Sequence, residues 1–437
     1  MCFSEKRIVA CCRLVKERQL AVHSHFNDQL CYRLYSRLET VNYIETTRPH
    51  GMIYNLNFNQ LGTLLAATRS NNSFVLYDPR FNRPVESKYC AHDDGVNCVT
   101  FLSPGRFATG SDDGLVALWD TRNISTPVCL LQGHAYSVKN IEYDGKSNRL
   151  FTIGFDDQVL SWDLDSVTAP LSEEFNVIMR LPDMCRLRLS PDSSKLLVTT
   201  RFNCFIIIND FDGGHIVRDM YSSFGVIQKI ALTYDSVVEQ GEMLEENERQ
   251  FLTRNRNAVS FHMALPTESE SLYISHPSIM SVCFHPSNKI IAYRTLQQRY
   301  DALQETTSLF DIRDTNTFRI KSTISQYYQT FPYRRTLACY KHESHAQHFI
   351  KEINFSPDGR LLASPVANSV QLMELTSQPD QHNFDPVRGL LPSSMRVLDC
   401  KLTRHHGPVL CCAFAPGDIL LASGAMDGTV FIHQPKL

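Results

Sequence analysis

The chain has 437 residues, of which 43% are apolar, so it can bury a large core as one large domain or two ordinary ones. Its formal net charge of −3 lacks the basic excess of nucleic-acid-binding proteins and argues against that class of partner. We find no signal peptide and no apolar run of the roughly 18 residues that a membrane span needs. The 14 cysteines therefore indicate free thiols in an intracellular protein of the cytoplasm or the nucleus.

Residues 1–36 precede the repeats described below and are predicted to form an N-terminal helical extension. Between residues 5 and 22 apolar side chains recur on one helical face, with Lys6, Arg13 and Glu17 on the other. Such a segment can pack on its own domain, fray as a tail, or dock as a helix into the groove of a partner.

A repeat of about 42 residues begins at His50. Two further histidines follow at this interval, and an aromatic–aspartate pair comes 27 or 28 residues after each histidine: His92 and His134, with Tyr77-Asp78, Trp119-Asp120 and Trp162-Asp163. A period of about 40–45 residues with an early histidine and a late Trp-Asp is typical of the blades of a WD40 propeller. The predicted fold is therefore an all-β, seven-bladed WD40 β-propeller.

Polar residues at fixed offsets in these copies predict a buried structural network. Each copy has a histidine, a Ser or Thr on the second strand, an Asp in the following turn and an aromatic residue six positions later. The sets are His92, Thr109, Asp113 and Trp119; His134, Thr152, Asp156 and Trp162; and His405 or His406, Ser423 and Asp427, with His433 in the tryptophan place. Asp can accept from His, while the hydroxyl joins the histidine to the indole N–H. We interpret these histidines as structural, not catalytic.

Weaker copies complete the predicted ring. The seven copies begin near residues 50, 92, 134, 176, 275, 345 and 405. Residues 222–277, between the fourth and fifth copies, exceed any normal blade connection and are predicted to be a long flexible insertion between blades four and five. This insertion is either a solvated disordered loop or a functional element on the rim opposite Arg122.

The last copy ends after only three strands. We expect its missing outer strand to come from residues 41–47, which would close the ring and remove an exposed sheet edge. The predicted propeller domain spans residues 37–437.

The sequence contains no phosphate-binding loop, no dinucleotide-binding fingerprint and no nucleophile elbow. His342, His345 and His348 could line a helix as metal ligands, but no supporting cysteine or carboxylate pair stands at ligand spacing, and one of them suits the sixth network better. We therefore expect no catalytic residue, no metal and no cofactor. A non-enzymatic binding module, acting through loops on a rigid ring, is the predicted class.

One residue in the stretch FATGSDDGLVALWDTR is not needed by the strand pattern. Arg122 follows Trp119-Asp120, at the end of the third strand of its blade. An ion pair with Asp120 would explain it, but exposed pairs contribute only about 0–1 kcal/mol. An arginine held at a rigid strand end also suits an interface anchor.

This stretch resembles the motif of WD40 proteins that dock on damaged-DNA-binding protein 1, the adaptor of cullin-4 RING ubiquitin ligases. Four longer segments are similar to the cullin-4-associated factors of the same family: GVNCVTFLSPGRFATGSDDGLVALWDTR, the following HAYSVKNIEYDGKSNRLFTIGFDDQVLSWD, IKEINFSPDGRLLASP and the terminal HQPKL. The resemblance implies adaptor contacts by Trp119, Asp120 and Arg122, with partial matches at Arg80 in VLYDPR and Arg313 in SLFDIR. Asp165 and Asp212 occupy the arginine place in the third and fourth copies, which should not take part.

The resemblance implies a non-catalytic substrate receptor of a cullin-4 ligase. One face of the propeller would bind the adaptor and the ligase core, and the other would present a target protein for ubiquitination. The alternative is a WD40 scaffold that assembles a different multiprotein complex. No feature of the sequence names the target.

Overall fold

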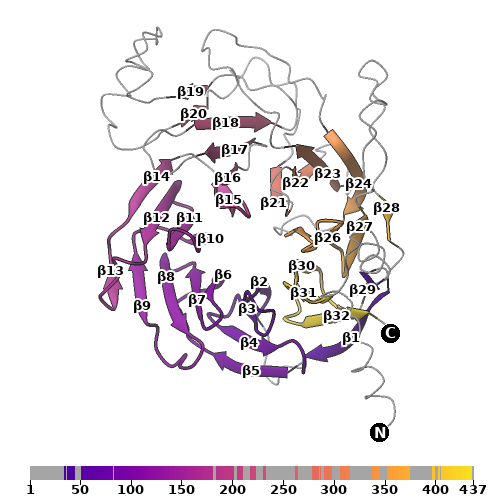
Figure 1. Cartoon of the computed structure of the whole chain (residues 1–437), viewed down its shortest axis with the longest axis horizontal. Helices are drawn as coiled ribbons and strands as arrows, with labels where there is room; N and C mark the ends of the chain where they lie inside the picture. The colour runs from indigo at the N-terminus through magenta and orange to yellow at the C-terminus, as the bar shows by residue number, and fades with distance from the viewer. Residues whose placement is uncertain are drawn as a thin grey trace, which may run out of the picture.

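The computed structural model describes residues 34–35, 37–44, 51–81, 83–180, 184–200, 204–209, 217–222, 230–232, 261–263, 278–284, 286, 290–297, 306–314, 336–344, 352–374, 396–398, 402–403 and 405–435. These residues form antiparallel sheets arranged around a common centre (Figure 1). Of the predicted helical extension, only residues 34 and 35 are described, and both are helical.

The first half of the chain forms four sheets, each built mainly from strands that follow one another in sequence. The first contains β2 (Ile53–Phe58), β3 (Leu65–Arg69), β4 (Phe74–Asp78) and β5 (Arg83–Lys88), and the second β6 (Val96–Ser103), β7 (Arg106–Ser111), β8 (Leu115–Asp120) and β9 (Cys129–Gln132). The third contains β10 (Val138–Asp144), β11 (Arg149–Gly154), β12 (Gln158–Asp163) and β14 (Asn176–Arg180), and the fourth β15 (Met184–Leu189), β16 (Lys195–Thr200), β17 (Cys204–Asn209) and β18 (Val217–Ser222).

Three further sheets follow. The fifth contains β21 (Ser278–Phe284), β22 (Ile290–Gln297), β23 (Thr306–Asp314) and β24 (Thr336–Ser344). The sixth contains β25 (Asn354–Phe355), β26 (Leu361–Val366), β27 (Ser369–Glu374), β28 (Arg396–Val397) and β29 (Leu402–Thr403). The seventh contains β30 (Val409–Phe414), β31 (Leu421–Ala425), β32 (Val430–Pro435) and β1 (Leu38–Ile44). A separate hairpin of β19 (Ile230–Leu232) and β20 (Phe261–Met263) lies within the predicted insertion 222–277, whose other residues from 223 on are not described.

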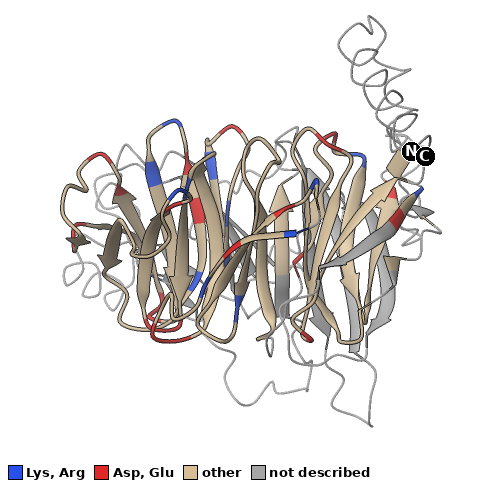
Figure 2. Cartoon of the chain, turned by 90° about the horizontal axis from the view of Figure 1, so that it is seen from below, with Lys and Arg blue, Asp and Glu red and all other residues tan. Residues whose placement is uncertain are grey.

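The first strand of each sheet contacts the first strand of the next, from β2 through β6, β10, β15, β21, β25 and β30 and back to β2. The predicted all-β WD40 propeller is thereby confirmed, and the count of seven blades for the whole chain stays a prediction. Seen from the side, the sheets stand between two rims of loops, and acidic and basic side chains occur on both rims (Figure 2). This mixture agrees with the small net charge of the chain.

The ring closes through the N-terminal segment, as predicted, but with a different register. β1 pairs with β32 over Leu38–Ile44, three residues earlier than the expected segment 41–47. Apolar anchoring explains the shift: Leu38 is buried, and the ring of Tyr35 packs edge-on against Phe414 at 5.6 Å. Residues 45–50 are not described.

The core lies between neighbouring sheets. Trp119 is 1% exposed and packs against Phe74 of the first sheet, with ring centroids 5.1 Å apart. Burial raises the pKa of the Cys98 thiol to about 12, so this cysteine is neutral and packs as a small apolar residue. Cys411 and Cys412 are likewise buried.

One connection departs from the simple hairpin order. After β12 the chain crosses to the neighbouring sheet, where β13 (Leu171–Ser172) pairs in parallel with the outer strand β9. The carbonyl of Pro170 accepts a hydrogen bond of 2.8 Å from the Leu130 amide. The second sheet therefore has five strands, and residues 164–170 lie between the second and third sheets at one rim.

Candidate functional site

A buried chain of hydrogen bonds joins the four polar residues of the second repeat. The Nδ1 atom of His92 lies 2.9 Å from Asp113, and its Nε2 atom lies 2.8 Å from the Thr109 hydroxyl. The indole N–H of Trp119 donates to the same hydroxyl at 2.8 Å. Because an indole only donates, Thr109 accepts from Trp119. Because an ionised carboxylate only accepts, His92 donates to Asp113 from Nδ1, and in that tautomer its Nε2 atom accepts from the Thr109 hydroxyl. The chain ties the turn at Asp113 to β7 and β8.

The third repeat holds the same arrangement. His134 lies 2.9 Å from Asp156 and 2.7 Å from Thr152, which accepts a hydrogen bond of 3.0 Å from Trp162. The pKa of the Asp156 carboxyl lies below its ordinary value. Burial alone would raise this pKa, but the hydrogen bond and charge of His134 have the larger, opposite effect. The same balance lowers the pKa of Asp113.

The last repeat differs from the expected arrangement. We expected Asp427 to accept directly from His405 or His406, but Thr429 lies between, 2.7 Å from His405 and 2.5 Å from Asp427. His405 also contacts Ser423 at 2.7 Å, and Ser423 contacts His433 at 2.8 Å. Asp427 instead accepts from the backbone amides of residues 406 and 407. A threonine two positions after the turn aspartate is the local signal for this relay.

Arg122 lies just beyond the end of β8 and holds Asp120 with its guanidinium fork. Nε donates to Oδ1 at 2.9 Å, and Nη2 donates to Oδ2 at 2.6 Å. These hydrogen bonds hold the pKa of Asp120 well below its usual range. The Arg122 side chain is nevertheless 83% exposed. The arginine is therefore oriented by its own chain while most of its surface faces solvent.

The same turn recurs in the first and third repeats. The backbone amide of Arg80 donates to Asp78 at 3.0 Å, and the amide of Asp165 donates to Asp163 at 3.0 Å. Arg80 is exposed, on the same rim as Arg122, because β4 and β8 end at that rim. The turn geometry is thus shared, and the third repeat carries an acidic residue in the arginine place.

Arg313 does not occupy the place that the sequence motif gave it. It lies inside β23, opposite Ile291 in β22 and Thr336 in β24, and not in a turn after the strand. β23 continues to Asp314 and pairs with strands on both sides, so the strand extends past the motif. Asp212 lies outside the described residues.

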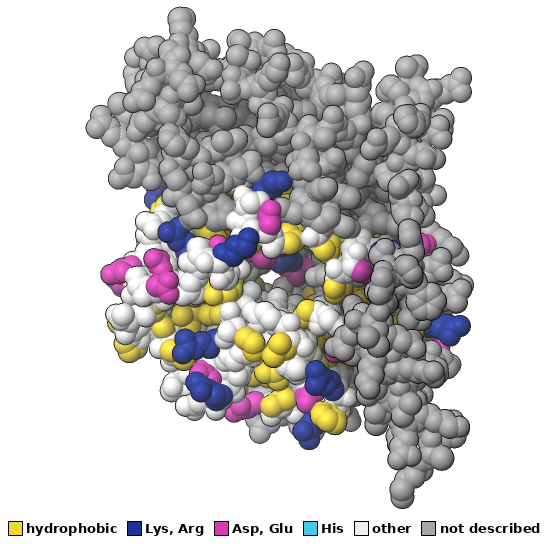
Figure 3. Space-filling model, in the orientation of Figure 1, with side chains coloured by type: hydrophobic (Ala, Val, Ile, Leu, Met, Phe, Trp, Pro, Cys, Tyr) yellow, Lys and Arg dark blue, Asp and Glu magenta, His cyan; other side chains and the backbone are white. Residues whose placement is uncertain are grey.

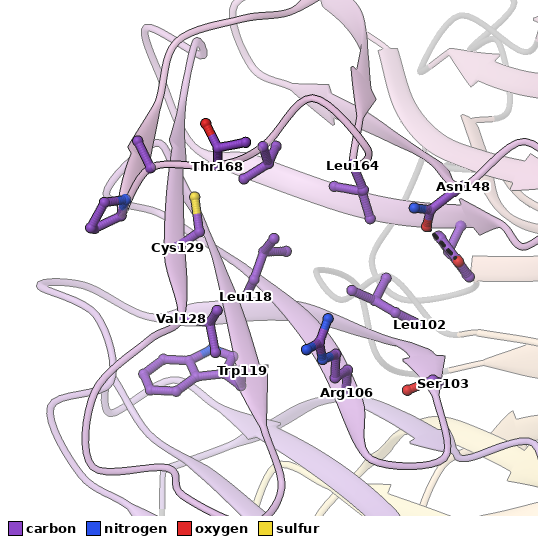
Figure 4. A pocket seen from close by; sticks show the side chains of 14 residues that line it. Leu102, Ser103, Arg106, Leu118, Trp119, Val128, Cys129, Asn148, Leu164 and Thr168 are labelled. Atoms are coloured by element: carbon purple, nitrogen blue, oxygen red, sulfur yellow. Dashed lines mark hydrogen bonds between the residues drawn. The ribbon is translucent and has the colours of Figure 1, made fainter.

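A pocket of about 480 Å³ opens on the Arg122 rim, between the second and third sheets (Figure 4). Its wall combines Leu118, Val128 and Leu164 with the polar side chains of Arg106 and Asn148. Arg106 is the cross-strand partner of Asp120, so the pocket adjoins the Asp120–Arg122 pair. The repeat pattern does not indicate this pocket, because residues 164–170 reach it through the parallel pairing of β13 with β9.

A charged cluster that the repeat pattern does not indicate lies among the inner strands. Glu352, 5% exposed, lies 3.3 Å from the Nη2 atom of Arg186 and 3.4 Å from that of Arg188. Arg188 also donates to Glu142 at 2.7 Å, and Asn55 donates to Glu352 at 2.8 Å. Burial raises the pKa of Glu142 despite Arg188. Arginines alternating with leucines in CRLRL were the available signal.

The face seen in Figure 3 is hollowed at the centre of the ring, where acidic, basic and apolar side chains adjoin. Among the residues that the structure describes, no three His, Cys, Asp or Glu side chains could together hold a metal ion. His342 lies in β24, so the helical arrangement considered for it is wrong. His345 and His348 are not described. In the same described part of the chain, no helix is long and apolar enough to cross a membrane.

The model of the family "WD domain, G-beta repeat" matches residues 83–120 and 397–434. "DDB1- and CUL4-associated factor 10" of Xenopus tropicalis is 29% identical over 429 residues, covering 92% of this chain and 89% of the relative. The Homo sapiens protein of the same name is also 29% identical, covering 90% of this chain and 71% of the relative. "Protein SOF1" of Saccharomyces cerevisiae is 29% identical over 108 residues, or 24% of this chain.

The repeats, the ring of sheets and these similarities agree with one another. The chain contains WD40 repeats, and over about nine-tenths of its length it is similar to the DDB1- and CUL4-associated factor 10 proteins.

Proposed function

We propose that this chain is the non-catalytic substrate-recognition subunit of a cullin-4 RING ubiquitin ligase. It docks on the adaptor, damaged-DNA-binding protein 1, through the rim that carries Arg122, and it presents a target protein for ubiquitination. The chain itself makes and breaks no covalent bond in this role.

The observation that carries the proposal is the Asp120–Arg122 turn. Two hydrogen bonds fix the guanidinium against Asp120, yet the side chain stays 83% exposed. An arginine oriented in advance loses little conformational entropy when it binds, and its planar fork matches carboxylate or carbonyl acceptors. These properties favour an interface anchor over a merely solvated strand end.

Two further features support the proposal. The pocket beside Arg106 and Val128 adjoins this turn, and a pocket next to an arginine is a typical place for an interface hot spot. The relatives aligned over nearly the whole chain are named as associated with DDB1 and CUL4. The name and the turn together favour a ligase receptor over a scaffold of another complex.

A binding titration with the purified adaptor tests the proposal. We expect the full chain to bind the adaptor in a one-to-one complex and to recover cullin-4 when both ligase components are present. Arg180→Ala serves as a control for surface charge, because it removes an exposed arginine at the last residue of β14. This variant should bind the adaptor like the unmodified chain. Absence of adaptor binding by the folded chain would favour the scaffold alternative.

A further inference from the structure

Four loops of the second and third sheets meet at the rim opposite Arg122. They comprise residues 91–95, 111–114, 134–137 and 154–157, which precede β6, β8, β10 and β12. Because β8 runs from Leu115 to Asp120, the loop at 111–114 and Arg122 lie at opposite ends of one strand. A partner on this rim would therefore leave the Arg122 rim open.

Two large aromatic side chains are exposed on this rim, in neighbouring loops of the third sheet. Tyr136 is 65% exposed and Phe155 is 41% exposed. Their loops are joined by a hydrogen bond of 2.9 Å from the Phe155 amide to the Ser137 carbonyl. Gly114 brings the loop of the second sheet against them, since a Cβ there would lie 3.4 Å from the Tyr136 carbonyl. Adjacent exposed aromatics typically mark an interaction surface.

The charge of the same four loops is strongly acidic. They contain six aspartates, at 93, 94, 112, 113, 156 and 157, and no lysine or arginine, while Lys139 at the start of β10 and Arg180 of β14, opposite Gln158, adjoin them. Asp113 and Asp156 belong to the histidine networks, while Asp93, Asp94 and Asp157 are exposed. An acidic surface attracts a basic partner and repels nucleic acid and other acidic partners.

The chain's own lysine shows how this surface holds a cation. The Nζ atom of Lys139 lies 2.6 Å from an Asp112 oxygen and 4.4 Å from the centre of the Phe155 ring. The ammonium group is thus held between a carboxylate and an aromatic face, the arrangement of a charge-assisted cation–π contact.

The acidic character continues toward the centre of the ring. Gly95 lies close to both Asp112 and Tyr54. A Cβ atom built on this glycine would be 3.2 Å from an Asp112 oxygen and 3.6 Å from the ring of Tyr54. Partial burial, followed by the negative charge of Asp112, raises the pKa of Tyr54. A segment lying across the rim would therefore meet aromatic and acidic groups in alternation.

We propose that this aromatic–acidic rim, formed by Tyr54, Tyr136, Phe155, Asp93, Asp94 and Asp157, binds a linear protein segment rich in lysine or arginine beside an apolar residue. Basic side chains would lie between the carboxylates and the tyrosine rings, and the apolar side chain would cover Phe155. That this segment belongs to the ubiquitination target rests on the proposed function; the binding itself does not.

Selection from a random linear-peptide library displayed on phage, with the full chain immobilised, tests this proposal. We expect enriched peptides to carry Lys or Arg together with aromatic or aliphatic residues, and to bind more weakly as salt concentration rises. The enriched peptides are then synthesised and titrated. Tyr136→Ala should weaken their binding about tenfold, the effect of a moderate hot spot. Phe81→Ala, which removes a 71% exposed ring at the other rim, is the matched control and should have no effect.

Charge is tested separately. Asp93→Asn and Asp157→Asn keep the shape of each side chain, and asparagine tolerates the positive φ of 59° at residue 157. Together they should weaken peptide binding and reduce its dependence on salt, without a change in melting temperature. Enrichment of neutral or acidic peptides, no enrichment at all, or full peptide binding by Tyr136→Ala would each overturn the proposal.

The two proposals fail in different ways. Arg122→Ala should lose adaptor binding and keep peptide binding, whereas Tyr136→Ala should do the reverse. If the adaptor does not bind but basic peptides still require Tyr136, the ligase assignment is wrong and the peptide-binding rim stands. If the adaptor binds and basic peptides do not, only the rim proposal fails.

Discussion

Glu352 accepts a hydrogen bond of 2.8 Å from Asn55, although 297 positions separate the two residues in the chain. The same carboxylate lies within ion-pair distance of Arg186 and Arg188, which belong to β15. Glu352 thus joins the first, fourth and sixth sheets at the centre of the ring, where a propeller has no continuous backbone to connect them.

Removing this carboxylate should weaken the whole ring. Glu352→Ala leaves two largely buried guanidinium groups with one partner fewer, and breaking a buried ion pair in this way typically costs about 3–5 kcal/mol. Chemical denaturation measures the loss of unfolding free energy. Glu173→Ala, which removes an exposed carboxylate, should have almost no effect. A Glu352→Ala protein as stable as the control would mean that the cluster does not stabilise the ring.

The tryptophan network should also be necessary for stability. Trp119 is almost fully buried against Phe74, so Trp119→Ala should lower the free energy of unfolding by about 3–5 kcal/mol. His134→Ala should destabilise the fold as well, because it leaves the Asp156 carboxylate and the Thr152 hydroxyl without their shared partner. Thermal melting of both variants provides the check, and an unchanged melting temperature for His134→Ala would contradict the structural role of the network.

Stability should fall in mild acid because of the last repeat. Burial lowers the pKa of His405 to about 4 and that of His433 to about 3, from 6.5 in the unfolded chain. Below pH 6.5 the unfolded chain binds protons that the folded protein does not, so the free energy of unfolding falls as the pH drops toward 4. The loss is on the order of 3 kcal/mol for one such histidine.

Denaturation curves between about pH 7 and about pH 4.5 measure this loss. His433→Gln keeps an N–H donor toward Ser423 but cannot titrate, and its stability should depend less steeply on pH. His406→Gln, at an exposed neighbouring histidine, serves as the control and should keep the original slope. Equal slopes for all three proteins would show that these buried imidazoles are not the source of acid sensitivity.

Arg122 should matter for binding and not for folding. Arg122→Ala removes a largely exposed side chain, so the melting temperature should stay the same while adaptor binding weakens by about 1–3 kcal/mol. Arg122→Lys should also bind less well, because an ammonium cannot reproduce the two-point contact with Asp120. Arg80→Ala should cost less, since its repeat has Tyr77 in place of the tryptophan.

Isothermal titration of each variant with the adaptor measures these differences, and Arg180→Ala controls for the loss of one surface charge. Normal binding by Arg122→Ala would reduce this residue to a solvated partner of Asp120. The ligase assignment would then depend only on similarity to the named relatives.

The sequence by itself determined what depends on contacts within one hairpin. Thr109, Asp113 and Trp119 lie within ten positions of one another, so their hydrogen bonds follow from strand period and turn position. The Asp120–Arg122 pair spans two positions and is equally local. The 42-residue period then repeats such hairpins, and a ring of sheets is the way to bury the faces that each one leaves uncovered.

Tertiary structure alone decided which repeats meet and in what register. Leu38 fixed the closing strand three residues earlier than the pattern indicated, because its side chain and Tyr35 find a buried site beside Phe414. The placing of Glu352 near Asn55 and Arg186 brings together residues from different repeats. A repeat pattern shows periodicity along the chain. The contacts around the central axis depend instead on how the sheets twist and pack, and this packing is determined only when the ring closes.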